Sequence, residues 1–375
     1  MISRKDILKL GGAGAFGVAI ARAASIAAQA AGSTPTSASA GGLGKLTTAD
    51  LRALPKLTPP DRIVRTGQTR HFILGLGTAN VEPLPGHSVP VRAVNGQSPG
   101  PTLHVTEGDD VEIVVVNRMA QPTTIHWHGI PVDWRMDGAA GISQQPIDPG
   151  SQFTYRWTAP QAGTYMYHSH YHDLEQESVS GMIVVAPQHS GREPRYDHDV
   201  PIMISSLPWE DARNIEAQAV LANSMLMPSM AVNPKADPVP DMGDSMDRMD
   251  MTEYWCLNGK TFPNTEPIDV KPGQIVRVRL ANLTAMTHPI HMHGHWFRWI
   301  AQDGSPLPVP QMMNTVPVNP GQTIDVDFVA NNPGVWPLHC HILAHMIDNH
   351  DMMTGLMTVI RYEGYSLPSM MTASM

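Results

Sequence analysis

The residue types that carry chemistry concentrate late in the chain, in the run Leu338-His339-Cys340-His341-Ile342-Leu343-Ala344-His345. The preceding Gly334-Val335-Trp336-Pro337 predicts a strand that leads into a loop. Side chains alternate along a strand, so we expect Cys340 on one face and His339 and His341 on the other. A thiolate, an imidazole and a nearby thioether are the ligand types of a copper centre that transfers electrons. The two remaining imidazoles suit a second metal site directly behind the first.

Histidines also recur in pairs of the form His-x-His, each within a segment that predicts a strand, where residues i and i+2 share one face. One such pair alone is typical of an exposed strand or an adventitious metal site. Four pairs at repeated spacing instead predict a specific cluster of imidazoles. The pairs are His126/His128, His168/His170, His291/His293 and His339/His341.

The spacing of these pairs reveals an internal repeat. A glycine turn precedes the first histidine of every pair by 18 positions. Two copies of one β-domain, each carrying two pairs, explain this pattern economically. The glycine and histidine positions are Gly108 and His126, Gly150 and His168, Gly273 and His291, and Gly321 and His339.

The two copies differ at the positions that matter for the thiolate site. Cys340 of the second copy corresponds to Ser169 of the first, and His288 corresponds to Thr123. The second copy also has a longer loop, which carries His345 and Met352. Only the second copy can therefore assemble a Cys-His-His site.

Short β-rich runs punctuated by Gly and Pro, without a long amphipathic helical pattern, predict an all-β fold of two Greek-key sandwich or barrel domains. The segment between them is rich in Pro, Asp and Met and is too short for another copy. We expect an export signal at 1–30, a flexible linker at 31–60, the first domain at 61–188, a linker at 189–251, the second domain at 252–364 and a tail at 365–375.

The N-terminal segment predicts export to the periplasm or the extracellular space. A charged start with Arg4 and Lys5 precedes a Gly/Ala-rich run and a small-residue cleavage site at Ala28-Gln29-Ala30. The start resembles a twin-arginine signal, but Lys5 replaces the second arginine, so both export routes stay open. A membrane anchor is the alternative, which the Gly and Ala content and Arg22 disfavour. No later run predicts a membrane span after processing.

Bulk composition narrows the class of partner. A net charge of -9 without a basic block argues against nucleic acid. Two cysteines do not make a disulfide scaffold, and Cys256 is most simply a buried free thiol. The 18 histidines and 24 methionines favour copper, because both side chains are copper ligands.

Together, the motifs His-Trp-His-Gly, His-Ser-His, His-Pro-Ile-His-Met-His-Gly and His-Cys-His-Ile-Leu-Ala-His resemble those of the multicopper oxidases. The resemblance covers both β-domains and implies that they are cupredoxin-like, with one type 1, one type 2 and two type 3 copper ions. By this resemblance, type 1 copper takes His288, Cys340 and His345; type 2 copper takes His126 and His291; one type 3 copper takes His128, His168 and His341; and the other takes His170, His293 and His339.

The family oxidises a reductant at type 1 copper and passes electrons through the Cys340 segment to the copper cluster, where O2 becomes water. The chain departs from the family at the axial ligand, since position 350 is histidine. Met352 aligns with the family's methionine after a two-residue insertion, and Met353 and His350 are rivals. Asp137 matches an acidic position of the family and is the candidate proton relay, although an Asp-Gly turn is an equally good interpretation.

A middle domain present in many relatives is missing here, which resembles the two-domain ("small laccase") branch. In that branch the cluster forms between the first domain of one chain and the second domain of its neighbour, in a homotrimer. We therefore predict a homotrimer with copper at the subunit interfaces; a cluster within one chain is the alternative.

The sequence leaves the reductant open. Seven methionines between Met225 and Met251 suit Cu(I), because thioethers prefer it, but a solvated linker with incidental methionines explains them as well. A phenol or an aromatic amine is the rival substrate. A different class of function, an exported protein that binds or buffers copper without turnover, also suits the methionine-rich segment. His172 and His295 adjoin the motifs and are candidates to support the ligands.

Overall fold

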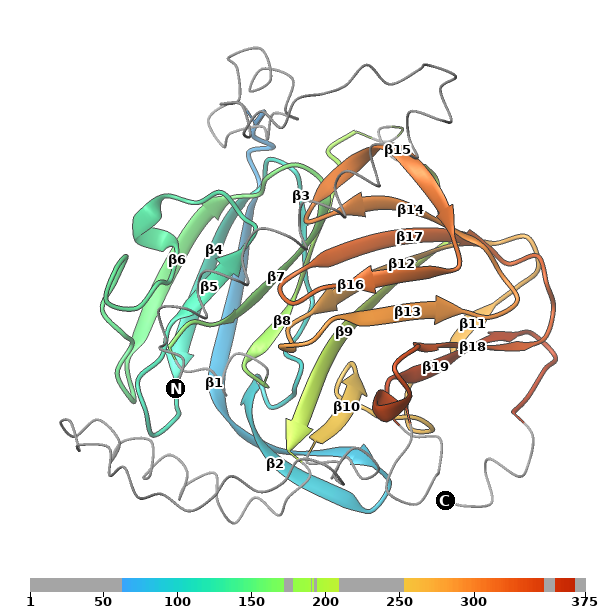
Figure 1. Cartoon of the computed structure of the whole chain (residues 1–375). Helices are drawn as coiled ribbons and strands as arrows, with labels where there is room; N and C mark the ends of the chain where they lie inside the picture. Colours follow the sequence, from blue (N-terminus) through green and yellow to red (C-terminus); the bar gives the residue numbers. More distant parts are fainter. Residues whose placement is uncertain are drawn as a thin grey trace, which may run out of the picture. The chain divides into compact units, whose positions relative to one another are not determined.

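The computed structural model describes residues 63–171, 178–189, 191, 194–208, 253–346 and 355–367 (Figure 1). The predicted export signal, the 31–60 linker, the methionine-rich segment, Met352 and most of the 365–375 tail lie outside these residues. No helix among the described residues is long and apolar enough to cross a membrane.

Alternation of apolar and polar side chains builds the strands of the first copy. In β4, Val111, Ile113 and Val115 are buried while their neighbours are half-buried, as expected for a strand with one face on a core. The elements are β1 (Thr69–Leu84), β2 (His87–Val94), β3 (Leu103–Thr106), β4 (Asp110–Asn117), β5 (Ile125–His128), η2 (Trp134–Met136, a 3-10 turn), β6 (Gln152–Thr158), β7 (Gly163–Ser169) and β8 (Ser180–Ala186).

These strands form two sheets, in the orders β2-β1-β4-β6 and β3-β8-β7-β5. Trp127, Tyr155 and Tyr167 are fully buried in the core of this copy. Pairing of β5 with β7 sets His126 opposite His168. The register of one strand pair thus brings two of the histidine pairs together.

The second copy repeats this plan with two larger sheets, ordered β10-β9-β12-β17-β14-β15 and β11-β19-β18-β13-β16. Its elements are β9 (His198–Pro208), β10 (Glu253–Leu257), β11 (Ile268–Val270), β12 (Ile275–Asn282), β13 (His288–Met292), β14 (Phe297–Gln302), β15 (Ser305–Met313), β16 (Thr315–Val318), β17 (Thr323–Val329), β18 (Val335–Cys340), η4 (Leu343–His345, a 3-10 turn) and β19 (Met357–Tyr362).

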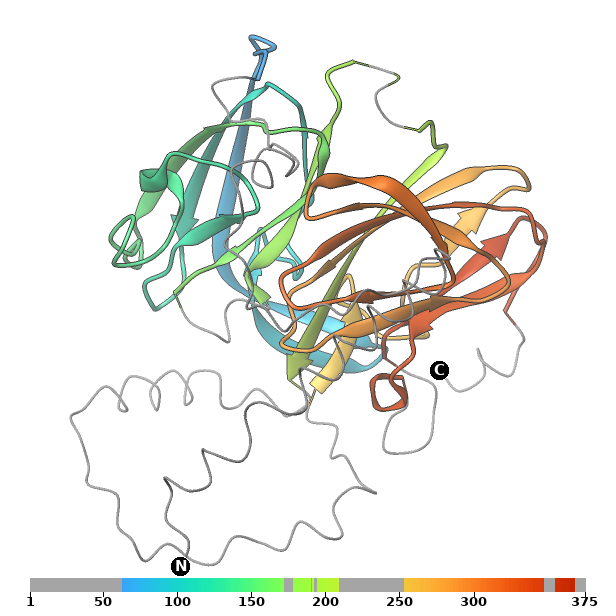
Figure 2. The same cartoon turned by 45° about the horizontal axis from the view of Figure 1, so that its top comes forward.

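The strand pairings show that the copies are equivalent. The parallel pair β1 and β4 corresponds to β9 and β12, and the parallel pair β3 and β8 corresponds to β11 and β19. Pairing of β13 with β18 sets His291 opposite His339, the same register as His126 and His168. Figures 1 and 2 show β13, β18 and β19 side by side from two directions. The predicted all-β fold of two cupredoxin-like domains is confirmed.

The linker prediction for 189–251 missed one strand. β9 pairs with β12 and β10 in the first sheet of the second copy, so this copy begins at β9 rather than near residue 252. The Pro, Asp and Met content of the whole segment masked a strand whose Ile202, Met203 and Ile204 are buried. Residues 209–252 therefore connect two adjacent strands of one sheet.

Buried polar side chains join β7 of the first copy to β12 and β17 of the second. Thr164 donates a hydrogen bond to Asp325 (Oγ1 to Oδ1, 2.5 Å), and Arg279 donates to Thr164 (2.9 Å) and Asp325 (3.1 Å). Arg279 also pairs with Asp199 of β9 at 2.6 Å. Each charge in this network has a partner, as burial requires.

Candidate metal centres

The second copy brings one thiol and two imidazoles into a buried triangle. Cys340 ends β18, His288 begins β13, and His345 ends η4. Sγ of Cys340 lies 3.7 Å from Nδ1 of His288 and 3.6 Å from Nδ1 of His345, and the two nitrogens are 3.1 Å apart. All three residues are buried. The fold thus brings His288, 52 positions before the cysteine, and His345, five positions after it, to the same sulfur atom.

Hydrogen bonds fix the orientation of this donor set. The Thr284 hydroxyl donates to Asn282, so it accepts from Nε2 of His288 at 2.7 Å. Nδ1 of His288 then carries the lone pair that points toward the sulfur. Burial raises the pKa of the Cys340 thiol to about 11, and the backbone N–H of Ile342, 3.5 Å from Sγ, partly offsets this effect. A bound cation is therefore needed to hold the thiolate at neutral pH.

The donors fit a copper ion in both type and spacing. A metal at the centre of a triangle of this size would lie about 2 Å from each donor, close to the usual bond lengths for imidazole nitrogen and thiolate sulfur. A trigonal set of one cysteine and two histidines is typical of copper sites that transfer electrons. The predicted axial ligand Met352 and its rivals Met353 and His350 lie outside the described residues.

The first copy has hydroxyl side chains at the positions where the second copy has His288 and Cys340. Thr123 and Ser169 correspond to His288 and Cys340, and their hydroxyl oxygens lie 2.9 Å apart in a hydrogen bond. Both residues are fully buried. The same scaffold therefore accommodates two small hydroxyl side chains where the second copy carries metal donors.

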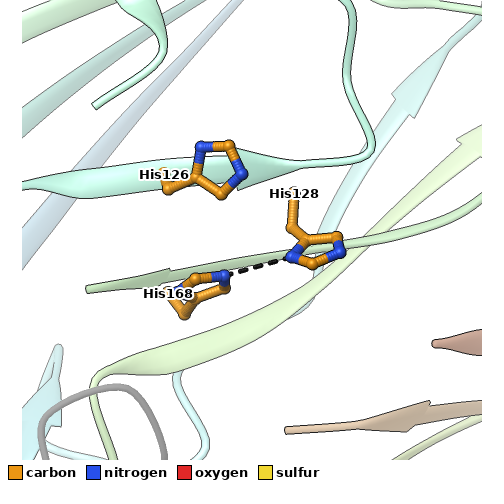
Figure 3. Close-up of side chains that lie close together, drawn as sticks. All are labelled: His126, His128 and His168. Atoms are coloured by element: carbon orange, nitrogen blue, oxygen red, sulfur yellow. Dashed lines mark hydrogen bonds between the residues drawn. The ribbon is translucent and has the colours of Figure 1, made fainter. Parts of the chain in front are cut away.

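A first set of histidines gathers on β5 and β7 of the first copy (Figure 3). Nδ1 of His128 lies 3.2 Å from Nε2 of His168, and the ring of His126 is centred 5.4 Å from that of His168. His170 follows the end of β7, is exposed, and has its ring centre 5.5 Å from that of His126. These four residues are called the first histidine set below.

A second set gathers on β13 and β18 and just beyond their ends, where His293 and His341 follow. Nε2 of His293 lies 2.9 Å from Nε2 of His339, while the ring of His291 is centred 4.8 Å from His293 and 5.6 Å from His341. His293 and His341 are exposed, whereas His339 is buried. These four residues are called the second histidine set.

Backbone carbonyl groups fix the protonation of one nitrogen in four of these rings. A carbonyl oxygen only accepts, so Nδ1 carries the hydrogen and Nε2 of the neutral ring keeps its lone pair for a metal. The bonds run from His126 to Asp137 O (2.8 Å), His168 to Ser169 O (2.8 Å), His291 to Asn314 O (2.7 Å) and His339 to Cys340 O (2.7 Å). Both sets thus present donor nitrogens without further rearrangement of these rings.

The two sets do not form one cluster within the chain. Among the described residues, the ring contacts of each set join histidines of the same copy. His128 instead lies against Gly321 of the second copy, where an added Cβ would be 3.3 Å from Cε1 of the imidazole. Among the described residues, the two sets are therefore separate groups of imidazoles.

His295 supports the second set through the backbone. Its Nδ1 donates to the carbonyl of His293 (3.0 Å), so its Nε2 accepts from the hydroxyl of Tyr362 (2.7 Å). The Tyr362 oxygen in turn accepts from the backbone N–H of Asn332 (3.0 Å). The sequence placed His295 beside the motif, but nothing in it pointed to the partner on β19. His172, the other supporting candidate, lies outside the described residues.

Asp137 adjoins the first set in two ways. Its carbonyl accepts the hydrogen bond from His126, and its carboxylate Oδ1 lies 3.4 Å from the same Nδ1. Gly138 follows with a φ of 82°, and a Cβ there would collide with the carbonyl of Ile125. The Asp-Gly turn and a carboxylate beside the histidines therefore coexist.

Comparison with known proteins decides the family. Two family models, both described as multicopper oxidase, match residues 76–190 and 232–361, which together span both copies. The chain belongs to the multicopper oxidase family.

Relatives of this multicopper oxidase include plant and bacterial proteins. Laccase-19 of Oryza sativa subsp. japonica is 34% identical over 263 residues, which cover 68% of this chain and 40% of the relative. Copper resistance protein A of Escherichia coli is 30% identical over 271 residues, which cover 63% of this chain and 42% of the relative. The chain thus spans less than half the length of these two relatives.

One solved structure is matched over a larger share of its own length than these two relatives are. The blue copper oxidase from Nitrosomonas europaea is 33% identical, with a TM-score of 0.66, and the alignment covers 79% of this chain and 86% of that one.

Burial of the histidines predicts that the metal-free protein is sensitive to acid. Burial lowers the pKa of His168 and His288 to about 3 and that of His345 to about 4. Between these values and the ordinary 6.5, the unfolded chain binds more protons than the folded one, so stability falls as the pH falls. Each histidine contributes about 1.4 kcal/mol per pH unit at most within this window.

Denaturant unfolding of the metal-free protein at pH 7, 6 and 5 measures this effect. We expect the free energy of unfolding to decrease steadily below pH 6.5, and copper loading to shift the decrease to lower pH because protons and metal compete for the same nitrogens. A free energy of unfolding that is constant between pH 6.5 and 5 would contradict the burial of these rings.

Proposed function

We propose that the chain is an exported, oxygen-reducing multicopper oxidase. It oxidises a small reductant one electron at a time at the Cys340 site and reduces O2 to water at a second copper centre, built from the two histidine sets. The phenols and aromatic amines suggested by the laccase relatives, and the Cu(I) suggested by the copper resistance relative, are the candidate reductants. The predicted signal segment and these relatives support a periplasmic or extracellular location.

One observation carries the proposal. The end of β18 places Cys340 in the buried triangle with His288 and His345, while its neighbour His339 faces the opposite side and contacts His293. The peptide links from Cys340 to His339 and His341 are covalent, so a short path through bonds joins the two sites. A copper-binding protein without turnover has no need for this connection.

Bound copper would supply one-electron storage at each site, and the protein supplies geometry and donors. His288, Cys340 and His345 would hold one ion, and the histidine sets would hold three. The close pairs support the ligand assignment made from the family resemblance. His128 and His168 share one type 3 ion in that assignment, and His293 and His339 share the other.

Asp137 would hold and deliver protons for the formation of water. Its carboxylate lies beside His126, and its side chain is 37% exposed, so it reaches both the histidine set and solvent. Reduction of O2 to water consumes protons, which a carboxylate in this position can relay.

We also propose a head-to-tail homotrimer. In the ligand assignment, each of the three cluster ions takes histidines from both sets, but among the described residues the ring contacts of each set join histidines of a single copy. The second set of a neighbouring chain would complete the coordination of the first set. A heterologous contact of this kind closes into a ring.

The mass of the copper-loaded protein in solution tests the trimer. We expect a mass of three chains with four copper ions bound per chain, and a loss of cluster copper when the assembly is diluted until it dissociates. A monomer that retains its full copper content would contradict this arrangement.

Oxygen uptake tests the function. Copper-loaded protein is supplied with a phenol and with Cu(I) in separate experiments, and peroxide is assayed in each. Uptake without peroxide is the expected result, and the faster reductant identifies the substrate class. No uptake by a fully loaded protein would overturn the proposal in favour of copper buffering.

A further inference from the structure

The face of β10 that points toward the thiolate site carries one aromatic side chain, Trp255. Side chains alternate along this strand. Tyr254 and Cys256 are buried against Val89 and Val91 of β2, so Trp255 lies on the other face, half-buried against the core that contains Cys340. A residue far from every sequence motif thus reaches the metal site.

Trp255 contacts both imidazoles of the site. The indole ring and the His345 ring have centroids 4.2 Å apart and planes inclined by 30°, which is a close, tilted contact. The His288 ring meets the indole edge-on, with centroids 5.3 Å apart and planes inclined by 63°. The imidazoles themselves are centred 4.8 Å apart. The three rings therefore pack against one another as one aromatic group.

This packing supplies the restraint that His345 otherwise lacks. Nε2 of His288 is held by the hydroxyl of Thr284. Nε2 of His345 makes no such bond within the described part of the chain, and the face of its ring lies on Trp255. Supporting contacts of this kind orient metal ligands and tune the metal that they bind.

The indole also packs on His345 and His288, which are 3% and 0% exposed, and so belongs to the packing that keeps water from the two imidazoles. Copper(II) with one thiolate carries a net positive charge, whereas copper(I) with one thiolate is neutral. Removal of water from the site therefore favours the reduced form and raises the reduction potential.

We infer that Trp255 is a positioning residue of the Cys340 site, which holds the ring of His345 in place and raises the reduction potential of the copper bound there. The inference rests on the proposed function, because it requires copper at this site. It goes beyond that function by assigning a role to a side chain outside the proposed ligand set.

The test compares Trp255→Ala and Trp255→Phe with Trp299→Ala in the full-length, copper-loaded protein. Trp299 is the matched control, because it is also half-buried against the same core, but its indole N–H donates to the carbonyl of Ala301 on its own strand. The measurements are a redox titration of the blue absorption band and the free energy of unfolding of each variant.

We expect Trp255→Ala to lower the ratio of Cu(I) to Cu(II) about tenfold at a fixed applied potential, which corresponds to about 59 mV for a one-electron couple. The band should also broaden as His345 gains freedom. Trp255→Phe keeps a smaller ring in the contact and should shift the potential in the same direction by less. Trp299→Ala should lose stability and keep the wild-type potential.

The outcomes separate this inference from the function on which it rests. A wild type with the blue band and a Trp255→Ala variant with an unchanged potential and band would overturn the role of Trp255 alone, as would equal shifts in Trp255→Ala and Trp299→Ala. A copper-loaded wild type without the blue band would overturn both the role of Trp255 and the proposed function. If Trp255→Ala fails to fold, an unchanged potential in Trp255→Phe overturns the inference.

Discussion

Replacement of Cys340 by serine is expected to abolish both the blue absorption and the oxidase activity, to below detection in each assay. Serine lacks the soft thiolate that binds the copper, and the path from this site to His339 and His341 then starts from an empty position. The fold should survive, because the first copy already carries Ser169 at the equivalent position and buries it in a hydrogen bond with Thr123. Absorption, copper content and oxygen uptake of the purified variant measure the effect.

Cys256 provides the matched control. It is also a free and fully buried cysteine of the second copy, but its thiol donates to the carbonyl of Tyr254 and lies outside the triangle. Cys256→Ser should keep the blue band and most of the activity. A Cys340→Ser variant that still consumes oxygen, or equal losses in the two variants, would contradict the assignment. A pure copper buffer would keep most of its metal in either variant and would show no activity to lose.

Arg279→Met is expected to destabilise the metal-free protein by about 3–5 kcal/mol, because it leaves a buried carboxylate without its cation. Arg279 and Asp325 are 1% and 5% exposed, and the guanidinium also binds Asp199 and Thr164. Burial raises the pKa of Asp325, and the neighbouring Arg279 opposes this shift. Loss of the cation should therefore make Asp325 take up a proton on folding. Denaturant unfolding at pH 7 measures the difference.

The exposed pair of Arg361 and Asp269 is the control for this effect. Its geometry is also bidentate, at 2.7 and 2.9 Å, but the two side chains are 35% and 63% exposed. Arg361→Met should cost about 1 kcal/mol or less, since water screens the pair. Equal costs for the two variants would show that the buried network contributes no more than a surface ion pair.

Periodicity in the sequence was sufficient to predict the arrangement around Cys340. Alternation along a strand placed the thiol opposite His339, and the structure has this geometry, with the thiol beside His288 and the imidazole beside His293. The repeat predicted that the first copy lacks a thiolate site, and Thr123 and Ser169 occupy that position. These predictions depend on local spacing and on comparison of two copies, both of which are visible in one sequence.

Contacts between distant strands could not be predicted in the same way. Trp255 reaches His345 only because β10 pairs with β9, and β9 itself was hidden in a segment that resembled a linker. The bond from His295 to Tyr362 joins residues 67 positions apart through the core. The alternating pattern Tyr254-Trp255-Cys256 was the available signal for β10, but three residues do not show what lies opposite each face.

The pairing of β9 with β10 shows between which elements of the chain the methionine-rich segment falls. Residues 209–252 connect two neighbouring strands of the sheet whose next strand is β12. The segment is therefore an insertion within the second copy. In the first copy, the equivalent connection between β1 and β2 spans only residues 85–86.

The most direct test of the central claim is the ratio of reductant oxidised to O2 consumed by the copper-loaded protein. A centre that joins the Cys340 site to both histidine sets delivers four electrons to each O2. We predict four one-electron equivalents of reductant per O2, with no peroxide formed. A ratio of two, with peroxide accumulating, would contradict a complete copper cluster and with it the proposed function.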